Sequence, residues 1–410
     1  AGESLKTLVS AAALANVRAF AGQDYIGYHT FMALVPAYQM ATELPTQQQA
    51  LPVLKVLYRN SSRIQTQGAG TQDALHPIVA ATSTGSSSAR NEDVGKGLRD
   101  AIHAIDWDAA ENRFATLAKG PVGEAFNHLQ YAVQDEVDVH RVVLSWRAWA
   151  MLDLTGREHA HSLLRQSVRY CLNSESYLKE KNRPRSAIRE LLPRLLDEHK
   201  LLANPPGNRR PDDAWIEELA TVIFAGTREQ AAEAVAAGMA EGFQLEAIGE
   251  AISLAANKLV LHDPGRLEQH SNAQKPPGCV HGDSVGVHAS DAANAWRSIS
   301  RVSNARNRIA SLIVGAFHTA GQSDRVTKEP YSYASLLEET RETDSKRLLI
   351  LAEEAIRAND QARACAVVQR FGNLQLPDRP LFDLLQKYAI SQDGALHAEK
   401  YYRTASEEYA

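Results

Sequence analysis

Apolar residues recur with helical spacing along most of this chain. Alanine-rich stretches place them at i, i+3, i+4 and i+7, which aligns them on one face of a helix. No segment sustains the alternation of apolar and polar residues that indicates a half-buried strand. The pattern therefore predicts an all-α fold, beginning with a short amphipathic helix within residues 1–20.

Breaks in this pattern divide the chain into three parts. Residues 204–212 (NPPGNRRPD) are predicted to be a linker, because their prolines and glycine prevent a helix from continuing. The linker separates an N-terminal helical half, residues 1–203, from a C-terminal half, residues 212–330. Residues 331–410 are predicted to form antiparallel helix hairpins at the C-terminus.

Short sequence motifs predict where turns, helix caps and loops lie between the helices. Thr227 and Gln230 have the spacing of a capping box, so a helix is expected to begin between them. Asn359–Asp360 is a predicted turn. Residues 83–96 are predicted to be a loop, and residues 262–286 form the longest irregular stretch. Long irregular segments in helical proteins are often functional.

Part of the sequence is duplicated. Residues 109–140 align without a gap on residues 231–262, and the two copies end in His140 and His262. A helical array needs only its apolar periodicity to repeat, so the repeated terminal histidine calls for another explanation. We expect a helical repeat or bundle with an internal duplication, in which duplicated helices bring polar groups to a metal site.

A looser repeat concerns helix starts. His29, His140 and His288 each open an apolar helix, in GYHTFMALVPAYQM, DVHRVVLSWRAWAM and GVHASDAANAWRSI. Another predicted helix follows each of them. Three histidines in equivalent positions predict that these helix starts converge on one pocket.

The duplicated histidines each have a polar residue four positions earlier. Glu136 precedes His140 and Lys258 precedes His262, a spacing that puts each pair on one helix face. A Glu/His pair suits iron or manganese. A desolvated, neutral Lys258 can add carbon dioxide, and this carboxylated lysine would imitate the carboxylate of Glu136. A surface ion pair and a solvent-reaching lysine are the ordinary alternatives.

Composition narrows the classes of function. The net charge of −5 gives no basic face for nucleic acid, and no apolar run approaches the ~20 residues of a membrane span. The chain has Cys171, Cys279 and Cys365, which lie far apart. This spacing favours a reducing compartment, and so a cytoplasmic location, over a disulfide framework or a zinc ribbon. GxGxxG, Walker, GxSxG and HExxH motifs are absent.

His29, His76 and several tryptophans each have both a functional and an ordinary interpretation. His29 and His76 lie in apolar contexts, and a neutral imidazole is the commonest metal ligand, although a lone buried histidine usually belongs to the core. Trp146, Trp149 and Trp296, with an arginine beside two of them, are candidates for a flat aromatic-substrate pocket. Tryptophans in such positions are more often core residues.

Three segments, GYHTFMALVPAYQMA, ALHPIVAATS and VHGDSVGVHAS, together resemble the questin oxidase-like family. The resemblance covers about a tenth of the chain. It implies an all-helical oxygenase that acts on aromatic, quinone-like molecules and holds a mononuclear non-heme iron with several histidines. His29, His76 and His288 are the residues that match the family's motif histidines.

We therefore expect a mononuclear non-heme iron oxygenase that takes an aromatic small molecule and dioxygen, with an electron-donor protein as a candidate partner. Zinc and manganese are the alternative metals. A non-catalytic helical scaffold and a metal-dependent hydrolase with carboxylated Lys258 are the rival functions. The expected metal ligands are His29, His76, Glu136, His140, Lys258, His262 and His288.

Overall fold

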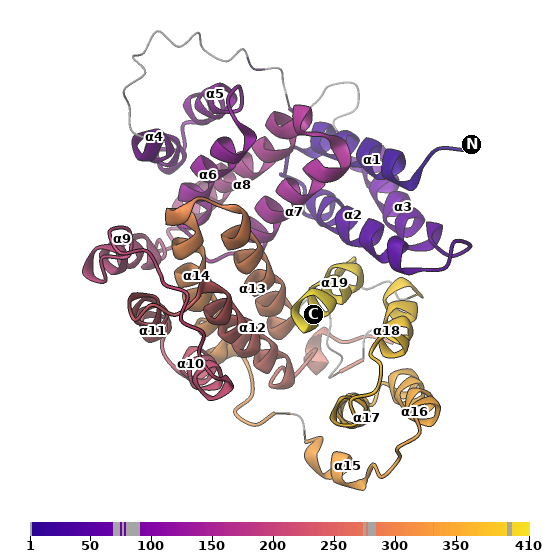
Figure 1. The fold of residues 1–410 in the computed structure, drawn as a ribbon. Helices are drawn as coiled ribbons and strands as arrows, with labels where there is room; N and C mark the ends of the chain where they lie inside the picture. The colour runs from indigo at the N-terminus through magenta and orange to yellow at the C-terminus, as the bar shows by residue number, and fades with distance from the viewer. Residues whose placement is uncertain are drawn as a thin grey trace.

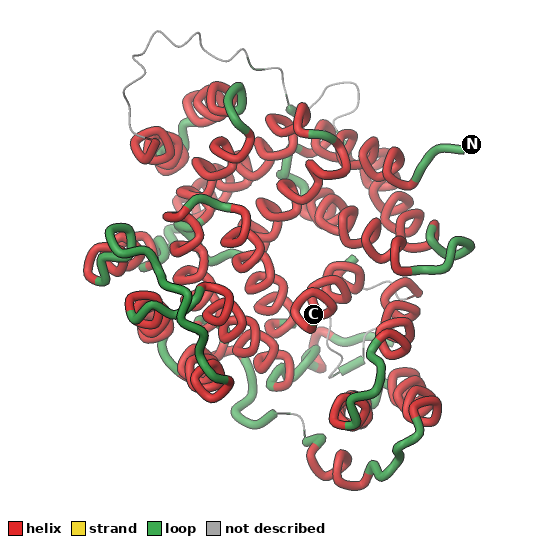
Figure 2. The backbone as a smooth tube through the Cα atoms, viewed as in Figure 1, coloured by secondary structure: helices red, strands yellow, loops and turns green. Residues whose placement is uncertain are grey.

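The fold is all-α, as the apolar spacing predicts. A computed structural model describes residues 2–68, 74–75, 78, 91–273, 276–277, 284–330, 332–391 and 396–410. These residues form nineteen α-helices and three short 3-10 turns, with no strand among them (Figures 1 and 2). An isolated β-bridge joins Arg209 and Phe243.

Nine helices form the first half of the molecule. α7 lies centrally among them and contacts α1, α2 and α8 (Figure 1). Of the predicted loop at residues 83–96, the part up to residue 90 lies outside the described residues. The rest of this prediction is wrong, because apolar Leu98 and Ile102 help to bury a helix that begins at Asn91. The helices are α1 (Leu5–Phe20), α2 (Tyr25–Glu43), α3 (Ala50–Gln67), α4 (Asn91–His103), α5 (Trp107–Leu117), α6 (Val122–Val133), α7 (Val139–Thr155), α8 (Ala160–Glu180) and α9 (Ile188–Glu198).

Five helices follow the linker, which contains no helix, as predicted. The Thr227–Gln230 capping box is present at the start of the second of them. α13 packs against α12, α14 and α7, so one hydrophobic core contains residues from before and after the linker. The five helices are α10 (Asp213–Ala225), α11 (Arg228–Ala240), α12 (Leu245–Leu261), α13 (Val285–Val302) and α14 (Ala305–Ala320).

The C-terminal helices separate into two groups. α16, α17 and α18 enclose a small core of their own, and Asn359 and Asp360 form the turn between the first two, as predicted. α19 leaves this group and lies against α2 and α13 (Figure 1). The helices are α15 (Ala334–Glu339), α16 (Ser345–Ala358), α17 (Gln361–Asn373), α18 (Arg379–Ser391) and α19 (His397–Tyr409).

Polar contacts hold α19 in this position. The hydroxyl of Tyr402 donates to Glu43 of α2 at 2.8 Å, and Arg403 pairs with the same carboxylate at 3.4 Å. On the other side, Glu408 pairs with Arg297 of α13. The last helix of the chain is therefore fixed between two helices that are distant in sequence. No helix in the described ranges combines the length and apolarity needed to cross a membrane.

Close packing of α13 on α12 gives a stability prediction. A Cβ added at Gly286 would lie 2.6 Å from Val260 Cα, so Gly286→Ala must push the start of α13 away. We expect a loss of about 1–3 kcal/mol in the free energy of unfolding, as is typical for overpacking. Urea denaturation checks this. Gly123→Ala is the matched control, because nothing lies within 4 Å of its added Cβ, and it should be neutral or stabilising; equal effects would contradict this packing.

Candidate functional site

Four histidines from four helices meet where α2, α7, α13 and α19 come together. They are His29, His140, His288 and His397, called the histidine cluster below. Ring centres lie 4.8 Å apart for His29–His140, 5.9 Å for His140–His288, 5.4 Å for His288–His397 and 5.1 Å for His29–His397. Each imidazole ring thus neighbours two others, and the four rings form a closed cycle of contacts.

Helix starts place these histidines. Each one lies within the first five residues of its helix. Side-chain caps fix three of the starts: Asp24 accepts from Gly27 N at 2.6 Å, Asp138 from His140 N at 2.7 Å and Ser284 from Val287 N at 3.1 Å. Such caps satisfy amide groups that have no partner within the helix. Local sequence therefore positions three of the four histidines, His29, His140 and His288, at the starts of their helices.

The ring nitrogens have distinct roles. Nδ1 of His29 lies 2.6 Å from the Tyr25 carbonyl oxygen, and Nδ1 of His288 lies 2.9 Å from the Ser284 carbonyl oxygen. A carbonyl only accepts, so both Nδ1 atoms carry the proton and both Nε2 atoms carry a lone pair. Nδ1 of His140 faces Asp138 Oδ1 at 3.4 Å. Metal-binding histidines typically donate their second nitrogen to a carbonyl or carboxylate in this way.

The Nε2 atoms of His29 and His140 face each other at 3.2 Å. Two lone pairs repel at this distance, so a proton on His140 or a cation between the rings must separate them. Two nitrogens that bind one metal ion at about 2.1 Å lie roughly 3.0–3.4 Å apart at octahedral or tetrahedral angles. Within the described residues, the buried Nε2 of His288 has no hydrogen-bond partner. In the same part of the chain, no group of three or more His, Cys, Asp or Glu side chains is placed so that it could hold a metal ion with the side chains as they stand.

The surroundings keep the imidazoles of His29 and His288 neutral. Burial is the largest cause that lowers the pKa of His29 below its usual value, and the charges of Lys400 and His140 lower it further. Burial, followed by Lys400 and His140, lowers the pKa of His288 to about 4. A neutral imidazole is the form that binds metal. Two of the four rings are therefore in the ligand state at neutral pH.

Acid should destabilise the metal-free protein through these two rings. In the unfolded chain His288 regains its ordinary value of 6.5, whereas in the folded protein it stays neutral down to a pKa of about 4. Between these values the unfolded chain binds more protons, so the free energy of unfolding falls as the pH falls, by at most about 1.4 kcal/mol per pH unit for each histidine. Urea titrations across this window test it. His288→Gln should flatten the slope, whereas exposed His270→Gln should not, and identical slopes would contradict the burial argument.

Aromatic residues and one carboxylate surround the cluster. The rings of Tyr25 and Tyr28 lie 4.3 and 5.0 Å from that of His29, and Tyr25 is 57% exposed. Tyr170 donates its hydroxyl to Asp138 Oδ2 at 3.1 Å. Burial raises the pKa of Asp138, but hydrogen bonds from His140 and from backbone amides outweigh it and hold this pKa below its usual range. Asp138 is therefore an anion that contacts His140, caps α7 and accepts from Tyr170.

Glu136 is not part of this cluster. Its Oε2 accepts from Ser186 N at 3.3 Å and pairs with Arg189 at 3.2 Å. The expected shared helix face with His140 is wrong, because α7 begins only at Val139 and Glu136 precedes it in a turn.

The second copy of the duplication also lies elsewhere. α12 continues through the positions that correspond to the turn before α7, so His262 ends a helix whereas His140 begins one. His262 Nδ1 lies 2.9 Å from the Thr327 carbonyl oxygen. Lys258 Nζ lies 5.8 Å from the ring centre of Phe224, and that ring also packs on His262. These two predicted ligands form a separate contact around Phe224.

The structure thus brings together three of the seven predicted ligands, His29, His140 and His288. His76 falls outside the described residues. Sequence reasoning missed His397, although it shares the signal of the other three, since it opens a helix (GALHAEKYYR). The polar character of α19 concealed this similarity.

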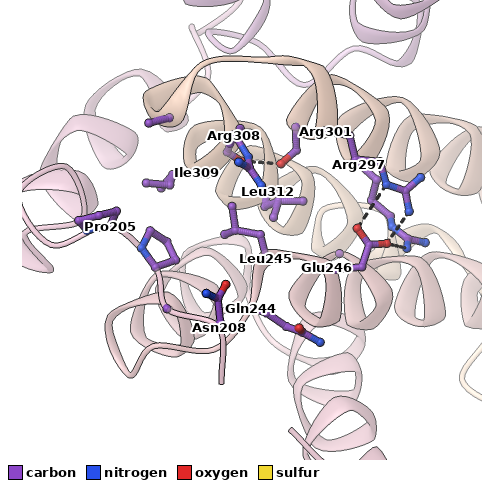
Figure 3. Close-up of a pocket in the computed structure, with 15 residues that line it drawn as sticks. Pro205, Asn208, Gln244, Leu245, Glu246, Arg297, Arg301, Arg308, Ile309 and Leu312 are labelled. Atoms are coloured by element: carbon purple, nitrogen blue, oxygen red, sulfur yellow. Dashed lines mark hydrogen bonds and ion pairs between the residues drawn. The ribbon is translucent and has the colours of Figure 1, made fainter. Parts of the chain in front are cut away.

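A cavity of about 350 Å³ opens away from the histidine cluster, between residues 205–208 and helices α12, α13 and α14 (Figure 3). Two of its three arginines already have partners, since Arg297 and Arg301 both pair with Glu246. Arg297 also pairs with Glu408 of α19. The pair with Glu408 holds α19 against α13, and the pairs with Glu246 join α12 to α13.

Comparisons with known proteins identify no relative of this chain. A scan against protein-family models found no match, and neither did searches of curated proteins and of solved structures. The resemblance to the questin oxidase-like family therefore stays a prediction.

Proposed function

We propose that His29, His140, His288 and His397 hold one iron ion and that the protein is a non-heme iron oxygenase acting on an aromatic small molecule. The observation that carries this proposal is the 3.2 Å approach of the two Nε2 atoms of His29 and His140. Nδ1 bonding of His29 and His288 to carbonyls supports it, because it directs both Nε2 lone pairs away from the backbone. Side-chain rotation is common when a site binds its ligand.

The ligand chemistry favours iron among the metals. Imidazole suits zinc, copper, iron and nickel, whereas manganese prefers carboxylate and water. Glu136 and Lys258 lie elsewhere, which removes the expected anionic ligand and with it the reason for manganese. Four protein ligands complete a tetrahedral zinc site and leave no open position for a hydrolytic water. An octahedral iron would keep two positions open, so an oxygenase fits this set better than a zinc hydrolase.

The chain's own residues have definite tasks in this proposal. An iron ion held in the cluster would supply one-electron chemistry with dioxygen. Asp138 orients His140 and favours the tautomer with a proton on Nδ1. The exposed ring of Tyr25 beside His29 offers an aromatic face to a planar substrate. Burial of the His29 side chain limits access of water to the cluster.

Oxygen consumption tests the function. Protein loaded anaerobically with ferrous iron is mixed with aerated buffer, a reductant and a panel of hydroquinones, and dioxygen is followed with an electrode. We expect substrate-dependent uptake that His140→Ala abolishes and His262→Ala retains. A folded, iron-loaded protein that consumes no dioxygen with any aromatic compound would contradict the oxygenase. Failure of the protein to bind any metal would favour the scaffold alternative.

A further inference from the structure

Three charged side chains lie deeper along the same helices that carry the histidine cluster. They are Arg147 of α7, Asp291 of α13 and Lys400 of α19, called the inner charged layer below. Each follows the cluster histidine of its own helix by three or seven residues, a spacing that keeps both on one helix face. Arg147, Asp291 and Lys400 are 1, 5 and 3% exposed.

The charges of this layer do not balance. Asp291 is its carboxylate, with Oδ1 3.8 Å from Arg147 Nη2 and 3.1 Å from the Thr404 hydroxyl that donates to it. Glu399 neighbours the layer but forms an ion pair with Lys55 at 2.6 Å. Two buried cations thus share one carboxylate, whereas buried charges are usually paired one to one.

Two hydrogen-bond donors of Arg147 also have no acceptor among the described residues. Its Nε and Nη2 atoms are buried, and no acceptor among the described residues lies within hydrogen-bonding distance of either. Buried polar groups nearly always have partners, and an exception indicates an ion, a water molecule or a ligand. The planar guanidinium fits the two oxygens of a carboxylate especially well.

We propose that the inner charged layer binds the anionic oxygen group of an aromatic ligand whose ring lies at the histidine cluster. The substrate class is therefore an aromatic carboxylate or phenolate in place of a neutral aromatic molecule. Placing the ring at the cluster rests on the proposed oxygenase function. Binding of the anion itself needs only Arg147 and Lys400, so it can be tested on protein without metal.

Calorimetric titrations at pH 7 compare three small probes: benzoate, 4-nitrophenolate and neutral benzamide. We expect one or both anions to bind and benzamide not to bind, and the stronger anion identifies the group that the layer prefers. Arg147→Met should weaken anion binding by about tenfold or more, the loss of one charge-assisted pair. Arg194→Met, which changes an exposed arginine of α9, should leave it unchanged. No anion binding, or equal binding to Arg147→Met, would overturn the proposal.

A second variant keeps the proposal testable if Arg147→Met fails to fold. Lys400→Met leaves one cation facing one carboxylate, so the ligand-free protein should keep or raise its melting temperature, while benzoate should no longer raise it. A lower melting temperature with a retained benzoate shift would give Lys400 a structural role only and contradict the proposal. Metal content separates the two claims. Iron without anion binding contradicts this inference alone, and anion binding without iron contradicts the oxygenase alone.

Discussion

Replacing His397 with alanine is expected to remove bound iron while leaving the fold intact. The side chain closes the cycle of four rings, lying 5.1 Å from His29 and 5.4 Å from His288. Loss of a residue that only orients a ligand typically weakens metal binding about 10–100-fold, so loss of a ligand should cost at least about 100-fold. Titration with ferrous iron under anaerobic conditions measures this affinity. Circular dichroism should show unchanged helix content.

His262→Ala is the matched control for this variant. His262 and His397 are both 9% exposed, and both lie at an end of a helix, but His262 contacts Thr327 and Phe224 outside the cluster. It should retain full iron affinity despite a comparable loss of buried side chain. Equal iron binding by the wild type and His397→Ala would show that α19 contributes no ligand.

Replacing Asp138 with asparagine should lower iron affinity about 10–100-fold with little effect on stability. The carboxylate faces Nδ1 of His140 at 3.4 Å and also accepts from the backbone amides of His140 and Arg141. Asparagine caps helices about as well as aspartate, so α7 should keep its start. What is lost is the negative charge that favours the proton on Nδ1 of His140. Iron titration and urea denaturation measure the two effects separately.

Asp106→Asn provides the comparison. Asp106 caps α5 by accepting from Ala109 N at 2.9 Å, and it has no contact with the cluster. Both variants should show similar, small changes in unfolding free energy, and only Asp138→Asn should lose iron. A parallel loss of iron in both variants would mean that general destabilisation causes the effect. Unchanged iron binding in Asp138→Asn would remove Asp138 from the site.

The fold could be predicted from the sequence because the signals for helices lie within short stretches of sequence. Apolar spacing, the linker at residues 204–212 and the capping box at Thr227 depend on neighbours a few positions away, and the structure contains all three. Exact helix starts were less predictable. A shift in one start explains the error at Glu136, which was placed on a helix that begins only at Val139.

The site was predictable only in part, since ligands from distant segments meet through tertiary packing. The repeated position of histidines at helix starts was the useful signal for His29, His140 and His288. Alignment of the duplicated segments was misleading, because the longer α12 carries His262 to a different environment. His397 depends on the docking of α19 against α2 and α13, which no local pattern encodes.

Anomalous diffraction from crystals of the iron-loaded protein, recorded at the iron absorption edge, tests the central claim most directly. The four-histidine site predicts one strong peak per chain, within bonding distance, about 2.1 Å, of the Nε2 atoms of His29 and His140. His288 and His397 should complete the set from the opposite side of the cluster. A peak elsewhere, for example beside His262, or no peak from protein crystallised with iron, would contradict the account.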